Sequence, residues 1–424
     1  MSHSRPLLAS LLVLGLTGCS RSSAPPPSEP TAPVQPTRER AVAASTAPAP
    51  TALAAASNGF GIALWTHLPA NTGNFTLSPA SIAAALAMTA AGARGETAAQ
   101  LATVLGPVDG AAWAELFAAL QDPARGAGVR VANRLFGERT YTFQPDFMER
   151  TARDFGAPLA AEDFRGAPTA ARDAINAWVA ERTERRILEL LPLDGVTADT
   201  RLILVNALYF LAKWAEPFEP SRTSPTPFRR SATDVVEVAT MNLTTHLRVG
   251  SVDGATVLEL PYRGGTTAMV VVVPEAVDGL AELEAGLAPD SVERWVAALG
   301  TAEKVWVSLP RFEVKPGAPM RLKDPLVAMG APLAFDPDRA DFRGIADPPS
   351  PGERLVVSDV FHSAFVRVDE AGTEAAAATA VAMAEAGSAP LQPRRVQVDR
   401  PFLFVILDTS SGVVLFLGRV VDPS

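Results

Sequence analysis

The sequence predicts one large α+β domain, preceded by an export signal and a polar tether. Three observations lead to this fold class. Apolar segments with helical spacing come first after residue 58, apolar runs with strand-like patterning follow, and no second linker or internal repeat divides them. A run of helices followed by a run of strands is typical of an α+β architecture. With 48% hydrophobic residues, the chain has ample material for one extensive core.

The composition excludes several classes of function. The formal net charge is -9 and no dense Lys/Arg block occurs, so nucleic acid is not expected as a partner. The chain has one cysteine, Cys19, and four histidines, so we expect no disulfide, no metal site and no cofactor. Neither a Gly-x-Ser-x-Gly nor a His-Glu-x-x-His motif occurs, and we therefore do not expect an enzyme.

The amino terminus has the features of an export signal. Arg5 precedes an apolar run, Leu7 to Leu16, that is short for a membrane span, and small residues follow it. The sequence Leu16-Thr17-Gly18-Cys19 resembles the bacterial lipoprotein box, in which the cysteine becomes the lipid-modified first residue. We expect residues 1–18 to be a lipoprotein-type signal peptide and Cys19 to be the lipidation site. A plain secretory signal is the alternative.

Residues 19–51 are rich in Pro, Ala, Ser and Thr and cannot bury enough apolar surface to fold, so we expect an extended tether. Residues 52–424 are predicted to form the folded domain, which we expect to be a monomer. The exported protein would be anchored to a membrane through the lipid on Cys19, at the outer membrane or cell surface, or would be extracellular.

Helices are predicted in the first half of the domain. Ser78-Pro79 has the residue types of a helix start, and Ile82 to Ala91 continue as an apolar helix. A second helical segment follows Gly95. Helical spacing returns from Ile175 through Leu190.

Strands are predicted in the second half. Leu202 to Phe210 is apolar apart from Asn206 and Tyr209, as expected for a strand that is covered on both faces. The remaining strands are expected at residues 257–262 and 267–273, as a hairpin around Gly264-Gly265, at residues 305–309, and at residues 402–407 and 413–417, as a final hairpin.

One segment, Thr373 to Ala386, fits two conformations. Its Ala, Glu and Met residues favour a helix, and a surface helix is one interpretation. In an extended conformation, neither of its faces has a bulky or charged side chain apart from Glu374 and Glu385 near the ends. The same segment could therefore enter a sheet between two existing strands.

The surrounding motifs favour the second interpretation. His362 to Thr379 resembles the hinge signature of serpins, in which a strand of the main sheet leads into an acidic residue, a glycine, a threonine and a run of alanines. Six further blocks resemble serpin motifs in the same order along the chain: residues 74–81, 92–97, 133–136, 175–179, 204–218, and 400–404 with 416–423.

The resemblance implies the serpin fold, with three β-sheets, about eight or nine helices and an exposed reactive loop at about residues 370–395. It also implies a suicide inhibitor of serine-type endopeptidases. A target serine protease attacks the loop and forms its acyl-enzyme, and the cleaved loop then inserts into the main sheet before water can hydrolyse the ester. The partner would be this protease, held as a covalent acyl complex.

A non-inhibitory serpin, acting as a binding or chaperone-like protein, is the alternative function. Such members tend to have charge, bulk or proline in the hinge, where this chain has Thr373, Ala375 and Ala377. The hinge therefore favours inhibition.

The resemblance also assigns site residues. The loop hinge would comprise Glu370, Gly372, Thr373, Glu374, Ala375, Ala376, Ala377, Ala378 and Thr379. A hydrogen-bond cluster beneath the sheet, called the shutter, would comprise Ser78, Ser81, Asn176, Asn206 and His362. Trp214 would lie at the breach, where the hinge enters the sheet. Purely structural roles are the alternatives, except that a buried amide such as Asn206 must find hydrogen-bond partners.

The usual spacing from Glu370 places the reactive bond at Ala386-Gly387. A small residue on the acyl side suits proteases with shallow primary pockets, of elastase-like or subtilisin-like type. Glu385 before it would instead suit a glutamate-specific protease.

Counting back from Pro401 would place the bond at Pro390-Leu391, but proline on the acyl side is a poor substrate for most such enzymes. Arg394 and Arg395 lie too far along the chain to leave a normal inserting length.

Overall fold

The computed structural model describes residues 51–68, 73–106, 110–122, 127–157, 159–315, 318–373 and 392–424. All of these belong to one structural unit, Ala44–Ser424. The expected signal peptide, the tether up to residue 50 and residues 374–391 of the expected reactive loop lie outside the described residues. No helix in the described ranges has both the length and the apolar character that a membrane span requires.

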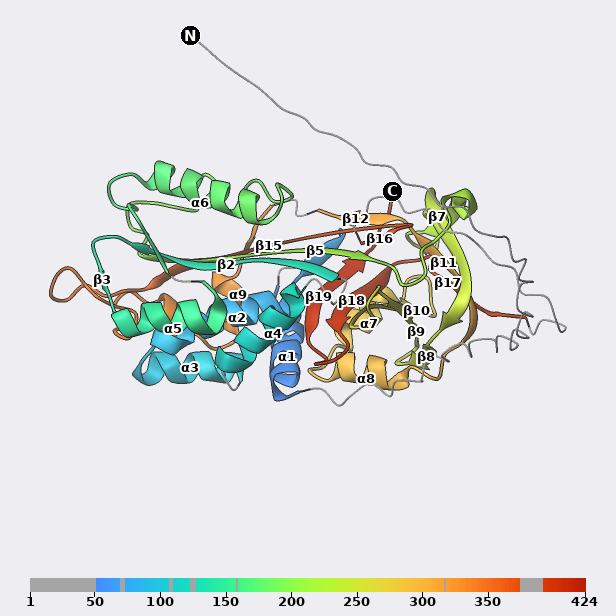
Figure 1. The fold of residues 1–424 in the computed structure, drawn as a ribbon, viewed down its shortest axis with the longest axis horizontal. Coiled ribbons are helices and arrows are strands. Elements are labelled where there is room, and N and C mark those ends of the chain that lie inside the picture. The colour runs from blue at the N-terminus through green and yellow to red at the C-terminus, as the bar shows by residue number, and fades with distance from the viewer. Residues whose placement is uncertain are drawn as a thin grey trace, which may run out of the picture. The chain divides into compact units, whose positions relative to one another are not determined.

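Three large β-sheets form the framework of the domain, as the α+β fold class predicted (Figure 1). The seven-stranded sheet contains, in spatial order, β12 (Phe312–Val314), β15 (Val357–Asp369), β16 (Gly372–Thr373), β5 (Leu202–Lys213), β2 (Ala127–Glu138) and β4 (Ala160–Glu162), with β13 (Met320–Arg321) paired to β15. The six-stranded sheet contains β1 (Phe75–Leu77), β19 (Val414–Val420), β18 (Phe402–Asp408), β10 (Thr267–Pro274), β9 (Ala255–Pro261) and β8 (Val249–Val252).

The four-stranded sheet contains β17 (Arg394–Gln397), β11 (Glu303–Pro310), β7 (Val235–Leu247) and β6 (Ser224–Arg229). A short pair, β14 (Ala346–Asp347) and β3 (Thr142–Phe143), completes the strands of the described ranges. The predicted hairpins at residues 257–273 and 402–417 are confirmed as β9–β10 and β18–β19, and the predicted strand at residues 305–309 as β11. Gly264 and Gly265 have φ of 94° and 70° in the first hairpin turn, a conformation that favours glycine.

Nine α-helices lie in the described part of the chain. They are α1 (Ala52–His67), α2 (Pro79–Gly92), α3 (Gly95–Leu105), α4 (Gly110–Gln121), α5 (Pro145–Phe155), α6 (Pro168–Arg182), α7 (Leu280–Ala285), α8 (Ser291–Ala298) and α9 (Lys323–Ala328). In Figure 1, α6 covers one face of the seven-stranded sheet, and α2 to α5 lie on the opposite face. The sheet is therefore covered on both sides.

Helix α2 begins where the sequence predicted. The Ser78 hydroxyl accepts a hydrogen bond from the backbone N–H of Ser81 at 3.2 Å, and Pro79 occupies the first turn. Nearly all of the helix is buried, because its small alanine side chains allow neighbouring elements to approach on every side. The residues at its start are thereby placed beneath the seven-stranded sheet.

Helix α6 ends earlier than the spacing predicted. It stops at Arg182, and Glu184 and Arg185 then take positive φ values of 49° and 62°, which an α-helix does not allow. Ile187 and Leu190 are nevertheless buried, in the same cluster as α6 and the outer face of the sheet. Their spacing arises because both are buried in a segment of turns, not because the segment is helical. The prediction of helix up to Leu190 was therefore wrong.

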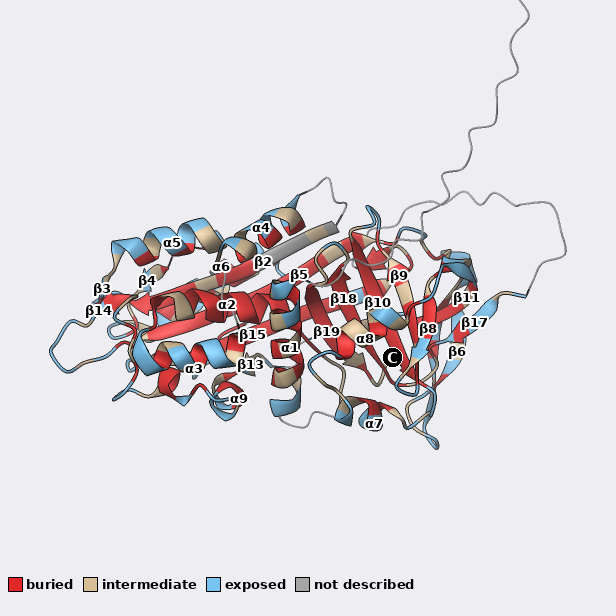
Figure 2. Ribbon diagram, turned by 90° about the horizontal axis from the view of Figure 1, so that it is seen from below, coloured by how far each residue is buried: buried red, intermediate tan, exposed pale blue. Residues whose placement is uncertain are grey.

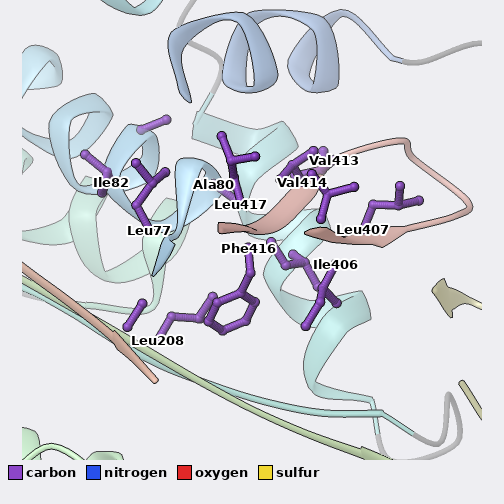
Figure 3. Packing of buried hydrophobic residues seen from close by; sticks show 14 of the residues in the cluster. Leu77, Ala80, Ile82, Leu208, Ile406, Leu407, Val413, Val414, Phe416 and Leu417 are labelled. Carbon is purple, nitrogen blue, oxygen red and sulfur yellow. The ribbon is translucent and has the colours of Figure 1, made fainter. Parts of the chain in front are cut away.

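Strand β5 is buried on both faces, as predicted from its apolar run. Leu204, Leu208 and Phe210 face the main core, whereas Val205 and Ala207 face the smaller cluster beneath α6. Figure 3 shows Leu208 of β5 together with Phe416 of β19, Leu77 of β1 and Ile82 of α2. Figure 2 shows that buried residues are concentrated in the sheets and in α2.

Candidate functional site

The centre of the seven-stranded sheet contains a parallel contact, which we call the seam. Here β15 and β5 run parallel in register from Asp359-Ile203 to Phe365-Tyr209, whereas β2 pairs with β5, and β12 with β15, in antiparallel fashion. At one end of the seam the short strand β16 lies between the two and is antiparallel to both. A longer antiparallel strand entering along this line would replace one parallel pairing with two antiparallel ones, which are slightly more stable per residue.

A buried cluster of polar side chains crosses the seam near its middle. His362 of β15 and Asn206 of β5 are direct register partners, and the Nδ1 atom of His362 is hydrogen-bonded to the Oδ1 atom of Asn206. The Asn206 amide group donates at 2.7 Å to the hydroxyl of Ser81 and at 2.7 Å to Oδ1 of Asn133. On the other side of the imidazole, the backbone N–H of Ser78 donates to Nε2 of His362 at 3.1 Å.

These contacts determine the tautomer of His362. Because Nε2 accepts the N–H of Ser78, the single ring proton must be on Nδ1 and is donated to Asn206. Complete burial lowers the pKa of His362 to about 3, against the opposing effect of the bond to Asn206, so the ring is neutral at pH 7. A second proton would face the N–H of Ser78, a donor, with no acceptor there.

The structure brings together four of the five residues that the sequence assigned to the shutter and places the fifth elsewhere. Asn176 lies on α6, on the other face of the sheet, where its Oδ1 atom accepts the N–H groups of Leu190 and Leu191 at 3.0 and 2.8 Å. It thus ties the segment after α6 back to the helix and makes no hydrogen bond to the cluster among the described contacts.

Asn133 of β2 occupies the place that was expected for Asn176. It is the register partner of Asn206, accepts from the Ser81 hydroxyl at 2.8 Å and donates to the Ser81 carbonyl at 3.2 Å. Its block, residues 133–136, resembles a serpin motif, but no role was predicted for Asn133. The signal was present: an amide within a strand that pairs with an otherwise apolar strand must itself find a partner.

The breach lies at the end of the seam where β16 pairs. The Thr373 hydroxyl is fully buried and is hydrogen-bonded to the Tyr262 hydroxyl at 2.6 Å. The Trp214 ring stacks on the Tyr262 ring at 4.5 Å between centroids, and its indole N–H donates to the carbonyl of Asp369 at 2.9 Å. Gly372 has a φ of 153°, and a Cβ there would lie 2.1 Å from the Ala212 carbonyl oxygen, so only glycine fits.

Glu370 is held just before this strand. Its carboxylate, 10% exposed, accepts hydrogen bonds from Nε and a terminal nitrogen of Arg311 and from the Thr223 hydroxyl. Although burial opposes ionisation, these hydrogen bonds hold the pKa of Glu370 below its usual value. No role was predicted for Tyr262, Arg311 and Thr223, since nothing in their local sequence indicates a contact with residues 370–373.

The remaining predicted site residues cannot be placed. Glu374, Ala375 to Thr379, the expected reactive residues Ala386 and Gly387, and Cys19 all lie outside the described residues. The described part of the hinge thus consists of Glu370, Gly372 and Thr373, together with Ala371. No group of His, Cys, Asp or Glu in the described ranges could hold a metal ion.

A family model described as "Serpin (serine protease inhibitor)" matches residues 55–423. The chain belongs to the serpin family. The assignment agrees with the resemblance seen in the sequence and with the prediction of a protease inhibitor that is not itself an enzyme. It also agrees with the fold, since a solved serpin matches this structure over nearly the whole domain.

Individual relatives cover nearly the whole domain. The pig leukocyte elastase inhibitor is 38% identical over 386 residues, which make up 88% of this serpin and 99% of the relative. The crystal structure of Serpin48 from the insect Tenebrio molitor has a TM-score of 0.77 at 31% identity and covers 87% of this chain and 97% of its own. Human thyroxine-binding globulin, solved with thyroxine, has a TM-score of 0.78 at 26% identity, covering 88% and 98%.

The neutral, buried His362 leads to a prediction about acid. Its pKa of about 3 in the folded protein lies below the usual 6.5, so the unfolded chain binds the proton more readily and stability decreases as the pH falls from about 6.5 towards 3. Between pH 7.5 and pH 5 we expect a loss of about 2 kcal/mol from this residue. Urea unfolding of the wild type and of His362→Gln at both pH values measures it. Equal pH dependence in the two proteins would contradict the assignment.

A second prediction concerns Arg311. Its replacement by Met leaves the buried carboxylate of Glu370 without its main partner and should lower the free energy of unfolding by about 1–3 kcal/mol. Arg367→Met is a matched control, because Arg367 is similarly exposed but lies 3.9 Å from Asp369 in a weak surface pair. Thermal unfolding of both variants tests this. A control that melts as low as Arg311→Met would refute a specific role for the Glu370 contact.

Proposed function

We propose that this serpin inhibits a serine protease as a suicide substrate, by inserting its cleaved reactive loop along the seam between β5 and β15. One observation carries the proposal. Gly372 and Thr373 already pair with Asp369 and Val368 on one side and with Lys213 and Ala212 on the other, in the antiparallel sense that an inserting strand requires. The next residues of the chain follow directly from this paired end of the seam.

The register of β16 predicts which side chains would be buried on insertion. Thr373 faces the main core, so every second residue after it would do the same. Continued two residues at a time, the register places Ala375 and then Ala377 between the core-facing residues of β15 and β5. Small, uncharged side chains at these positions support insertion, because a charge there would be buried without a partner.

The same register places Thr379 at the polar cluster. It would lie opposite His362 on one strand and Asn206 on the other, between the two groups that are hydrogen-bonded to each other before cleavage. Separating the strands breaks that bond, and a hydroxyl can both donate and accept. The Thr379 hydroxyl would therefore accept the hydrogen bond that His362 donates and donate one to Asn206, replacing the bond that is lost.

The length of the sheet supports a reactive bond at Ala386-Gly387. Strand β5 begins at Leu202, whose partner in the continued register is Met383, three residues before Ala386. A cut after Pro390 would leave seven residues beyond the strand. An inserted strand of residues 373–383 would be about 36 Å long at about 3.3 Å per residue. That length would move an attached protease along most of the sheet.

The chemistry of the first step belongs to the protease. Its serine oxygen attacks the carbonyl carbon of Ala386, the bond to the Gly387 nitrogen breaks, and the new amine takes a proton from the protease's histidine. Ala386 then remains as an ester on the serine. Each new backbone hydrogen bond of the inserting strand contributes about 0.5–1.5 kcal/mol, so insertion lowers the free energy. The movement pulls on the protease through the ester, so that its active site no longer positions water to hydrolyse that ester.

The small side chain of Ala386 suits elastase-like or subtilisin-like targets, since a shallow primary pocket accepts alanine. The name of the pig relative, leukocyte elastase inhibitor, supports the elastase-like choice. We infer that the target belongs to one of these two classes and that the serpin acts as a monomer.

The covalent complex provides the main test. Mixed with an elastase or a subtilisin, the wild type should give a band of summed mass on a denaturing gel. Ala375→Arg and Ala377→Pro should give only cleaved chain, because the first buries a charge and the second removes a backbone donor during insertion. Glu374→Arg is the matched control, since in the continued register position 374 would face the opposite side of the sheet and its residue is already charged, and it should still form the complex. A wild type that is merely cleaved would indicate a non-inhibitory serpin.

We further propose that the serpin is exported and anchored to a membrane through Cys19. The lipoprotein-like sequence at residues 16–19 and the Pro/Ala-rich stretch that follows support this proposal. Expressed in a Gram-negative host with its own signal, the wild type should incorporate labelled palmitate and partition into detergent, and Cys19→Ser should do neither. Incorporation by the variant, or none by the wild type, would refute it.

A further inference from the structure

The outward face of the four-stranded sheet contains a basic and aromatic surface beside the point where the reactive loop rejoins the sheet. We call it the basic strip and define it by Lys304 and Trp306 of β11, Arg395 of β17 and His246 of β7. Trp306 is the register partner of Arg395 on one side and of Thr244 on the other, and Lys304 is the partner of His246. The four side chains therefore lie on adjacent positions of one sheet face.

Burial shows that this face points to solvent. Val305, Val307 and Leu309, the alternate residues of β11, are fully buried in the main core, so Lys304 and Trp306 point the other way. Lys304, His246 and Arg395 are exposed and Trp306 is half-buried. The Arg395 guanidinium lies over the Trp306 ring, 5.5 Å from its centroid, which holds both groups in place.

The strip is positive in a chain whose net charge is -9. None of the residues on this face of β17, β11 and β7 is acidic: they are Arg395, Gln397, Lys304, Trp306, Asn242, Thr244, His246 and the buried Ser308. Arg394, on the opposite face, pairs with Glu303 at 3.1 Å, whereas Arg395 and Lys304 have no salt bridge to any described residue. Charge on an edge strand protects it from aggregation, which explains Arg395 but neither Lys304 nor Trp306 on the inner strand β11.

The position of the strip indicates its partner. Gly387 comes eight positions before Arg395, so the expected reactive bond is at most about 28 Å from the strip along the chain. A protease of about 230 residues has a radius of gyration of about 17 Å, and one that grips the loop would overhang this face. We propose that the basic strip is a second docking surface for the target protease, which meets an acidic rim beside the protease's active-site cleft.

This inference rests on the proposed inhibitory function and adds selectivity to it. Ala386 alone would fit every protease with a shallow primary pocket. The basic strip would additionally favour those proteases whose surface beside the active-site cleft is acidic. Complementary charges mainly raise the association rate, and an arginine stacked on a tryptophan is typical of the residues that contribute most to binding. The strip acts before cleavage, and the seam acts after it.

Charge reversal tests the strip. Arg395→Glu combined with Lys304→Glu should lower the association rate constant with an elastase-type protease of acidic rim by about tenfold at low ionic strength, and much less at high salt. The covalent complex and the number of serpin molecules consumed per protease should not change, because the seam is intact. A protease variant with its rim acids changed to lysine should restore the rate.

The matched control is Arg339→Glu combined with Arg343→Glu. It makes the same change in net charge on exposed arginines that contact α3 and its neighbourhood, away from β17 (Figure 1), and should leave the rate unchanged. Trp306→Ala should lower the rate and Trp306→Phe should largely preserve it. Equal rates for the strip variant, the control and the wild type would overturn the proposal.

A second measurement separates failure of the strip from failure of inhibition. Binding to a protease whose serine is replaced by alanine needs no acyl-enzyme, so the strip variant should bind it more weakly even if no covalent complex ever forms. If the variants change neither binding nor rate, but abolish an acceleration that heparin produces with the wild type, the strip binds a sulfated polyanion instead and the proposal is wrong.

Discussion

The parallel contact between β5 and β15 is the constraint on which the rest of this serpin depends. Two long central strands lie in register without a strand between them, although β16 already occupies that line at one end. Everything at the site either holds the seam closed or prepares the strand that would open it. The hinge begins in the sheet, Gly372 permits its close approach to Ala212, and the Tyr262 hydroxyl receives Thr373.

The polar cluster gives the seam its specificity. His362, Asn206, Asn133 and Ser81 are buried, and each satisfies the next, so that losing one partner leaves a costly unpaired group. Apolar side chains would let the two strands slide or part gradually, whereas this network has one closed arrangement. In the inserted state proposed here, Thr379 would offer the cluster a second bonded arrangement. Both arrangements need the neutral form of His362. In a charged ring, Nε2 would have a proton that faces the N–H of Ser78 and finds no acceptor.

Recognition and trapping use different sheets. The basic strip lies on the four-stranded sheet, next to the returning end of the loop, while the leaving end of the loop starts at the seam of the seven-stranded sheet. Glu370 lies between them, with its carboxylate bound by Arg311, the residue that directly follows β11. Cleavage frees one end of the loop from the other. The protease can thus be chosen by one surface and carried away along another, which keeps selectivity independent of the small hinge residues that insertion requires.

The sequence by itself determined much of the fold: the start of α2 at Ser78, the buried strand β5 and both hairpins follow from local pattern, because burial and turn chemistry act over a few residues. It also indicated Asn206 and His362, polar residues in apolar strands. Only the tertiary structure decided their partners. Asn133, not Asn176, joins the cluster, and Arg311, Thr223 and Tyr262 meet the hinge, because hydrogen bonds between residues far apart in sequence depend on register and on which face of a sheet each element covers. The end of α6 at Arg182 has the same explanation. The apolar spacing beyond it shows which residues are buried, but packing of this segment against the sheet decides that the chain turns there and does not continue as a helix.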